Sequence, residues 1–179
     1  LNTQHLTNGG LLDGSRALHL QADLFDNLQG ATLHSGGDLT LNPAQLNNAG
    51  LIAGDGNMTL SGDSLDNRGE INARSLRADY LDLNNQQGGV LLSQQQLTAT
   101  SKRMDNGGQI AAAALSISGD RLDNHGTLQS NDNLTLQVQT VDNRGDILSD
   151  GALVVKGDSL NNSGLLQGMT TALTLAQQF

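Results

Sequence analysis

Carboxylates recur at one position along this sequence, and paired carboxylates can cleave glycosidic bonds. Asp105, Asp123 and Asp142 each stand directly before an asparagine. A glycosidase needs two such groups about 5–10 Å apart in a groove, with pKa values tuned for acid and base roles. Asparagine replaces the aspartate at other copies of the position, for example at Asn47 and Asn84, as expected of a residue that caps a turn. We therefore interpret these side chains as turn residues and expect no catalytic residue.

A second set of acidic residues, which includes Asp38, Asp55, Asp132 and Asp150, could supply oxygen ligands to calcium. Calcium takes about six to eight such ligands, and calcium-binding β-roll repeats carry a dense nonapeptide pattern. That pattern is missing, so ordinary turns are expected at these positions. The four histidines share neither a metal-ligand spacing nor a partner nucleophile. The sequence therefore predicts no bound metal, no cofactor and no enzyme activity.

Basic and aromatic residues gather in two less regular stretches. Arg74, Arg77 and Tyr80 lie within "NARSLRADYLDL", and Lys102 and Arg103 lie within "TATSKRMDN". Aromatic residues and arginine are enriched at recognition surfaces. These five residues are a candidate patch for binding a receptor or a glycan. The alternative is that they are solvated surface residues.

A repeat with a period near 19 must position all of these side chains. The recurring unit reads apolar residue, Asp or Asn, Asn, variable residue, Gly, as in Leu122–Gly126, with Thr7 in place of Asp or Asn in the first copy. The position numbers of successive asparagines differ by 19, 21, 19, 18, 21, 18, 19 and 19. Phe179 follows Leu160 at the same spacing of 19 and would open a further copy. The nine repeated asparagines are Asn8, Asn27, Asn48, Asn67, Asn85, Asn106, Asn124, Asn143 and Asn162.

Apolar residues alternate with polar ones inside each copy, as at Leu134, Leu136 and Val138. A period of two indicates short strands. Helical solenoid repeats are longer than these, and a leucine-rich repeat would need a helical stretch for which the unit has no room. Stacked strand units can bury an apolar face that one unit cannot. The sequence therefore predicts an all-β fold, a parallel β-helix of about nine coils, right-handed because parallel crossovers almost always are.

The physics of such a coil assigns roles to the repeated residues. Equivalent positions on adjacent coils lie about 4.8 Å apart, so the nine asparagines should stack as a hydrogen-bonded ladder. The glycine that follows each asparagine should supply a left-handed turn. After Asn27 and Asn85 the glycine comes one position late, which predicts a loop longer by one residue. The turn glycines are Gly10, Gly30, Gly50, Gly69, Gly88, Gly108, Gly126, Gly145 and Gly164.

Composition argues against several partners. The net charge is −9, and nine basic residues spread along 179 positions make no cluster that could follow a phosphate backbone. Nucleic acid and anionic membrane surfaces are therefore not expected as partners. No apolar run approaches the ~20 residues that span a bilayer, so no membrane insertion is expected either. Cysteine is absent, which excludes disulfides and thiolate metal sites.

Four copies of the repeat carry a family resemblance. The strings "SLDNRGEINA" (64–73), "RLDNHGTLQS" (121–130), "TVDNRGDILS" (140–149) and "SLNNSGLLQG" (159–168) resemble the haemagglutinin repeats of filamentous haemagglutinin-type exoproteins. These exoproteins belong to two-partner secretion systems and include adhesins and contact-dependent growth inhibition effectors. The resemblance implies a right-handed β-helical shaft that is secreted through an outer-membrane transporter and displayed on the bacterial cell surface. Residues 1–179 would be a single β-helical repeat segment, an internal fragment of a longer exoprotein.

Three functions follow from these observations. The first is a structural shaft that projects adhesive or toxin domains from the cell. The second is a segment that binds a receptor or glycan on a host or target cell through a contiguous patch around Arg77 and Tyr80. The third is a polysaccharide-cleaving β-helix enzyme, which would need a groove of clustered carboxylates. The turn interpretation of the aspartates favours the shaft.

Overall fold

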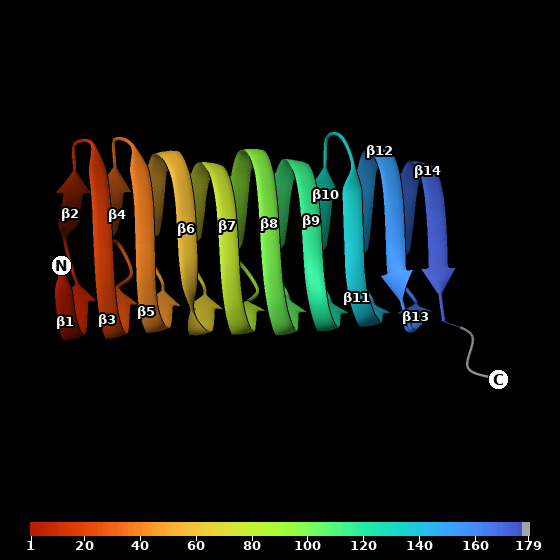
Figure 1. Cartoon of the computed structure of the whole chain (residues 1–179), viewed down its shortest axis with the longest axis horizontal. Helices are drawn as coiled ribbons and strands as arrows, with labels where there is room; N and C mark the ends of the chain where they lie inside the picture. Colours follow the sequence, from red (N-terminus) through yellow and green to blue (C-terminus); the bar gives the residue numbers. More distant parts are fainter. Residues whose placement is uncertain (177–179) are drawn as a thin grey trace.

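Parallel strands wind into a stack of coils along the whole of the computed structural model, which describes residues 1–176 (Figure 1). Phe179, the expected start of a further repeat, lies outside these residues. No described residue is helical, so none of the described chain is a helix able to cross a membrane. The strands are β1 (Asn2–Asn8), β2 (Leu11–Gly14), β3 (Ala17–Asn27), β4 (Thr32–Ser35), β5 (Asp38–Asn48), β6 (Leu51–Asn67), β7 (Glu70–Asn85), β8 (Val90–Asn106), β9 (Gln109–Asn124), β10 (Thr127–Ser130), β11 (Leu134–Asn143), β12 (Asp146–Gly157), β13 (Ser159–Asn162) and β14 (Leu165–Leu175).

Each coil pairs in parallel with the next, in a register that keeps the repeat aligned. Asn27 lies beside Asn8 in one pairing and beside Asn48 in the next, and the later asparagines continue this column. In Figure 1 the near strands run downward and the far strands upward as the chain advances from its N-terminus on the left, which makes the coil right-handed. The predicted all-β parallel β-helix of about nine coils is confirmed. At ~4.8 Å per coil the rod is about 43 Å long.

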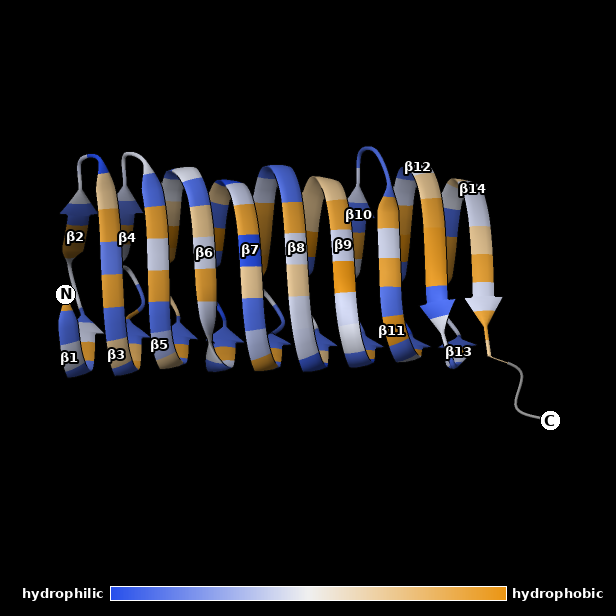
Figure 2. Ribbon diagram, viewed as in Figure 1, coloured by the Kyte–Doolittle hydropathy of each residue, from blue (hydrophilic) through white to orange (hydrophobic). Residues whose placement is uncertain are grey.

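Three straight runs and three corners make up one coil. In β7 the runs are 70–73, 75–80 and 82–85, and the corner residues Arg74 and Leu81 fall outside the ladder pairing with β6. Alternate side chains of each run point inward, so the ribbon changes between apolar and polar along every strand (Figure 2). The inward columns form one continuous core, in which Leu33, Leu65, Ile71, Leu91 and Leu134 are at most 1% exposed. Period-two alternation is thus the pattern of a strand that is buried on one side.

Two insertions lengthen the corner that follows the asparagine, which we call the first corner. Four residues, 28–31, separate Asn27 from β4, whereas only Ala49 and Gly50 separate Asn48 from β6. The insertion is therefore two residues long, not one as expected from the sequence, and 86–89 repeat it after Asn85. Each insertion closes a four-residue turn in which the third residue, Gly30 or Gly88, has a φ of 80° or 86°. That conformation is the one that only glycine adopts readily.

The other predicted turn glycines are not left-handed, and this part of the prediction is wrong. Among residues 1–176, only Gly30, Gly88 and Gly119 have positive φ. A different constraint explains the repeated glycine, because the backbone of the previous coil passes too close for a side chain. An added Cβ would lie 2.1 Å from the Gly50 oxygen at Gly69, and 2.0 Å from the Gly108 oxygen at Gly126.

Gly30 and Gly88 also lie outside the glycine column. The ladder hydrogen bonds at this corner run from Leu51 N to Ala31 O (2.9 Å) and from Gln109 N to Gly89 O (2.9 Å). The place that glycine holds in the other coils therefore belongs to Ala31 and Gly89 in the two longer loops. The shorter coils arise at the next corner, where Arg74 alone stands opposite Asp55 and Gly56 of the preceding coil.

Replacing Gly126 by alanine tests the close-approach account. The new methyl group would overlap the Gly108 carbonyl oxygen, so we expect Gly126→Ala to lower the free energy of unfolding by about 1–3 kcal/mol. Gly10→Ala is the matched control, because an added Cβ there meets nothing within 4 Å. Urea denaturation measures both. Equal, small effects at the two sites would contradict the close-approach account.

Candidate functional site

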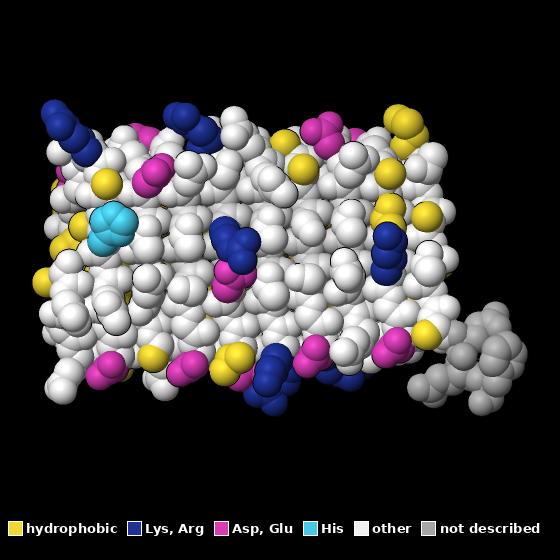
Figure 3. All heavy atoms as spheres, in the orientation of Figure 1, with side chains coloured by type: hydrophobic (Ala, Val, Ile, Leu, Met, Phe, Trp, Pro, Cys, Tyr) yellow, Lys and Arg dark blue, Asp and Glu magenta, His cyan; other side chains and the backbone are white. Residues whose placement is uncertain are grey.

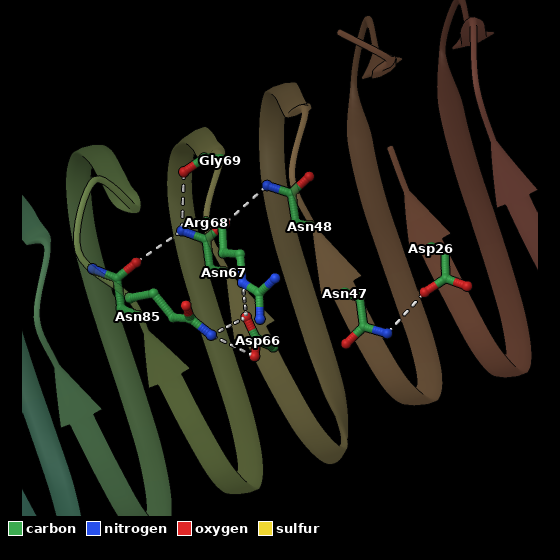
Figure 4. A network of polar contacts seen from close by, with 9 residues as sticks. Asp26, Asn47, Asn48, Asp66, Asn67, Arg68, Gly69 and Asn85 are labelled. Atoms are coloured by element: carbon green, nitrogen blue, oxygen red, sulfur yellow. Dashed lines mark hydrogen bonds and ion pairs between the residues drawn. The ribbon is translucent and has the colours of Figure 1, made fainter. Parts of the chain in front are cut away.

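A column of buried amides runs the length of the rod at the first corner. The Nδ2 of each ladder asparagine donates to the Oδ1 of the next at 2.7–2.9 Å, from Asn8 through to Asn162. Asn67, Asn85 and Asn106 are fully buried. Figure 4 shows three consecutive members, Asn48, Asn67 and Asn85, joined in this way. An amide is both donor and acceptor, so one residue type can repeat without leaving a partner unmatched.

A second hydrogen bond ties each amide to the backbone of the next coil. Asn67 Nδ2 lies 3.2 Å from the Val90 carbonyl oxygen, and Asn48 Nδ2 lies 3.1 Å from that of Glu70. These bonds run from the N-terminal coil toward the C-terminal coil at every step. The amides therefore hold the first corner of one coil onto the first corner of the next, where the interior would otherwise be purely apolar.

A serine column at the second corner, which follows the run after the first corner, was missed by the sequence reasoning. Ser130 Oγ lies 2.8 Å from the Ala113 oxygen and 2.9 Å from the Asn133 oxygen. Ser93 and Ser149 make the equivalent pair of contacts, and Ser35 makes one of them. All four serines are at most 6% exposed. The signal was present in the sequence, since a serine stood at an inward position of the alternation where an apolar residue was expected.

The repeated aspartates lie side by side but are not turn residues. Asp105, Asp123 and Asp142 occupy one outward column at the ends of β8, β9 and β11, so the turn interpretation is corrected to that of strand residues on the surface. Asp123 pairs with Arg121 at 2.6 Å, and Asp142 pairs with Arg144 at 2.9 Å. Within residues 1–176 no group of three or more His, Cys, Asp or Glu could hold a metal ion. The arrangement is that of a surface charge network.

The expected binding patch does not form. Tyr80 is 3% exposed, its ring lies within the core, and burial raises the pKa of its hydroxyl. The exposed Arg77 pairs with Asp79 at 2.7 Å on the second run of the coil, whereas Arg103 pairs with Asp82 at the start of the third run. Figure 3 shows the same dispersal, with most charged side chains along the borders of the face in view. Tyr80 fails as a surface residue because its position in the alternation is inward, between Gly62 and Ser101.

The remaining basic residues of the proposed patch are also apart. Arg74 is exposed at the second corner, and Lys102 is exposed beside Arg103 at the third. The patch of Arg74, Arg77, Tyr80, Lys102 and Arg103 is therefore not contiguous. The two stretches that depart from the repeat lie in a coil of 18 residues and the following coil of 21 residues, which pair in parallel with one register shift at the second corner.

One histidine lies between two carboxylates on the run after the first corner. His34 Nδ1 is 2.7 Å from Asp13 Oδ1, and His34 Nε2 is 3.7 Å from Asp55 Oδ2. The hydrogen bond to Asp13, followed by the charge of Asp55, raises the pKa of His34 above its usual 6.5. The three side chains join the first three coils across the surface.

Comparison with known proteins matches this geometry to a family. The haemagglutinin repeat family matches residues 2–75, 64–125 and 110–179, which together cover nearly the whole chain. The chain belongs to the haemagglutinin repeat family. The resemblance inferred from the four strings is confirmed, and members of this kind are secreted, surface-exposed exoproteins. No solved structure matches the chain closely.

Curated relatives are similar to this chain over most of its length. The chain is 35% identical over 160 residues to "Deoxyribonuclease CdiA" of Dickeya dadantii, covering 85% of the chain and 4% of that protein. It is 36% identical over 140 residues to "Toxin CdiA" of Escherichia coli, covering 75% of the chain and 4% of that protein. A "16S rRNA endonuclease CdiA" of Enterobacter cloacae is 33% identical over 136 residues, covering 76% of the chain and 4% of that protein. The chain thus spans a small part of each relative.

Removing one member of the amide column tests its contribution to the haemagglutinin repeats. Asn106→Ala leaves the Asn124 oxygen without its donor, and it leaves the Asn85 amide with only its backbone acceptors. We expect the free energy of unfolding to fall by roughly 2–4 kcal/mol, since a buried unpaired polar group costs about 1–3 kcal/mol. The neighbouring Asp105→Ala, on the exposed side of the same strand, should change it by less than about 0.5 kcal/mol. Equal effects in urea denaturation would contradict a role for the column.

The histidine between two carboxylates predicts a pH dependence. The folded-state pKa of His34 is raised, so its contribution to stability is complete below pH 6.5 and is lost as the pH rises through the folded-state pKa. The stability difference between the native protein and His34→Gln should therefore be largest near pH 5.5 and vanish at high pH. Thermal melting across this range measures it, with His19→Gln as the control. A difference that does not change with pH would contradict the prediction.

Proposed function

We propose that this segment is part of the shaft of a large secreted exoprotein and holds distal adhesive or toxin domains away from the cell surface. The observation that carries the proposal is the unbroken register of the coils. Every ladder asparagine from Asn8 to Asn143 bonds to the next, and each change in coil length is absorbed at a corner. Because insertions at the corners leave the rod straight, the rod is suited to holding a distal domain at a fixed distance from the cell surface.

The physical basis of the shaft is the direction of its hydrogen bonds. Both the backbone ladder and the amide column run along the rod axis, so extension or bending must stretch many bonds at once. Each coil rests on the coil before it, so the stack can grow from a chain that emerges gradually. We propose that an outer-membrane two-partner secretion transporter exports the chain in this manner. The names of the relatives, "Toxin CdiA" among them, support a toxin as the domain carried.

Exchange of whole coils in the full-length exoprotein tests the shaft. Residues 107–162, three coils from Asn106 to Asn162, would be replaced by three coils of the Dickeya dadantii relative. We expect the same amount of protein at the cell surface and the same activity of the distal domain, because a shaft contributes length rather than specific side chains. Immunolabelling of the distal domain and a competition assay between cells measure the two quantities.

Deletion of the same three coils is the companion variant. It should bring the distal domain about 14 Å closer to the cell while leaving the domain folded, at ~4.8 Å per coil. Loss of attachment or activity in the equal-length exchange, with normal surface display, would contradict the shaft and show that this segment itself engages a partner.

A further inference from the structure

One repeat position opens a hollow on the surface of the rod. The residue after each ladder asparagine points outward at the first corner, where it is Leu28, Ala49 and Arg68 on three successive coils. The small side chain of Ala49 between two large ones leaves a concave space of about 260 Å³. The two-residue insertion before β4 shapes one wall by presenting Leu28, which is 45% exposed.

The floor of the hollow is a row of fixed polar groups. Asn47 Nδ2 donates to Asp26 Oδ1 at 2.8 Å, so the Asn47 Oδ1 atom is turned toward the next coil, where Asp66 lies (Figure 4). His5 lies 2.9 Å from the other Asp26 oxygen, and Gln86 Nε2 donates to both oxygens of Asp66. These side chains are therefore held in place before any ligand arrives.

Side-chain atoms that can make further hydrogen bonds face the solvent between Asn47 and Arg68. The Asn47 oxygen accepts no hydrogen bond from residues 1–176, and Asp66 on the next coil, which accepts from Gln86 and lies beside Arg68 Nε, keeps a lone pair on Oδ2 for a further donor. On the wall above, Arg68 Nε lies 3.3 Å from Asp66 Oδ1, and its two Nη atoms make no hydrogen bond to the described chain. A ligand for this arrangement would donate to the oxygens, accept from the guanidinium and rest an apolar edge on Leu28.

The charge and the volume of the hollow limit the class of ligand that it could bind. The hollow carries two carboxylates, Asp26 and Asp66, against one guanidinium, within a chain of net charge −9. An anionic ligand would be repelled, and the guanidinium disfavours a cation. Neutral hydroxyl groups donate and accept equally, which suits the mixed lining. The volume is below the ~300–1,000 Å³ of pockets for drug-sized ligands, so it admits a single ring rather than a long chain.

We propose that the hollow formed by Leu28, Asn47, Ala49, Asp66 and Arg68 binds one neutral sugar residue of a glycan. Pairs of neighbouring hydroxyls would bridge the Asn47 oxygen and the Asp66 carboxylate and accept from Arg68 Nη. The carbon face of the ring would lie against Leu28. This site is separate from Arg77 and Tyr80 and is independent of the shaft, because a rod that binds no sugar still sets a distance.

Titration of the intact segment with methyl glycosides tests the proposal. The probes are the methyl glycosides of glucose, galactose, mannose and N-acetylglucosamine, with glucuronic acid and N-acetylneuraminic acid as charged comparisons. We expect at least one neutral probe to shift the backbone amide NMR signals of 28–31 and 47–50, with a dissociation constant of about 1–10 mM. The charged probes should bind at least tenfold more weakly.

The repeat itself supplies the matched variants. Ala49→Arg fills the hollow with the residue found at the same position one coil later. The backbone is alike at the two positions, because Ala49 N and Arg68 N each donate at 2.8 Å to the backbone carbonyl oxygen of the ladder asparagine in the previous coil. It should weaken sugar binding at least tenfold and leave the melting temperature unchanged. His125→Arg makes the equivalent substitution four coils away and should leave binding unchanged. Arg68→Ala should weaken binding, because it removes the guanidinium whose Nη atoms would donate hydrogen bonds to the sugar.

Three results would overturn the sugar site. The first is that no neutral probe shifts these signals at about 50 mM, a concentration well above the expected dissociation constant. The second is that binding survives Ala49→Arg in a folded protein. The third is that only the charged probes bind. None of them would affect the shaft, whose test is the exchange of coils. Conversely, a sugar site confirmed in a segment that cannot be exchanged would show that the segment is adhesive.

Discussion

Every coil of this protein lies about 4.8 Å from a near copy of itself, and each column of the rod must satisfy that constraint. Apolar columns do so readily, because a leucine packs on a leucine. A buried polar column can do so only if its residue complements its own kind. The amide of asparagine meets this condition and a carboxylate does not. The inward column is therefore uniformly asparagine, while the outward column beside it mixes Asp and Asn and begins with Thr7.

The same spacing governs the backbone. At the first corner the chain turns so tightly that the carbonyl of one coil occupies the space of the next residue's Cβ, as between Gly50 and Gly69. Glycine is required there by its size rather than by its conformational freedom. Of the two longer corners, residues 28–31 place Ala31 where the other coils have glycine, whereas residues 86–89 keep Gly89, at which an added Cβ would lie 2.5 Å from the Asn67 carbonyl oxygen. The corners are thus the part of the coil whose length can vary, and this variation makes the surface of the rod uneven.

Most of the fold could be predicted because the sequence contains nine copies of the same structural unit. The coil and its register follow from a period near 19 with internal alternation, whereas the right hand was expected only from the general rule for parallel crossovers. Tyr80 shows where the reasoning failed, because a rare residue type was read as a surface feature although its place in the alternation was inward. The hollow at Ala49 could not be predicted, since it depends on the sizes of three side chains that lie one coil apart along the chain and meet only when it is wound. The size of the insertions was equally hidden, because only the structure shows which residue continues the glycine column.

The amide column also has a direction. Each asparagine presents its nitrogen to the following coil and its oxygen to the preceding one. Any cross-section of the rod therefore has a donor side and an acceptor side, and only these two sides match. The rod is a polar filament in the sense that its two faces are chemically distinct, as the two ends of a cytoskeletal polymer are. Head-to-tail stacking is satisfied at every coil, and head-to-head contact would set donor against donor.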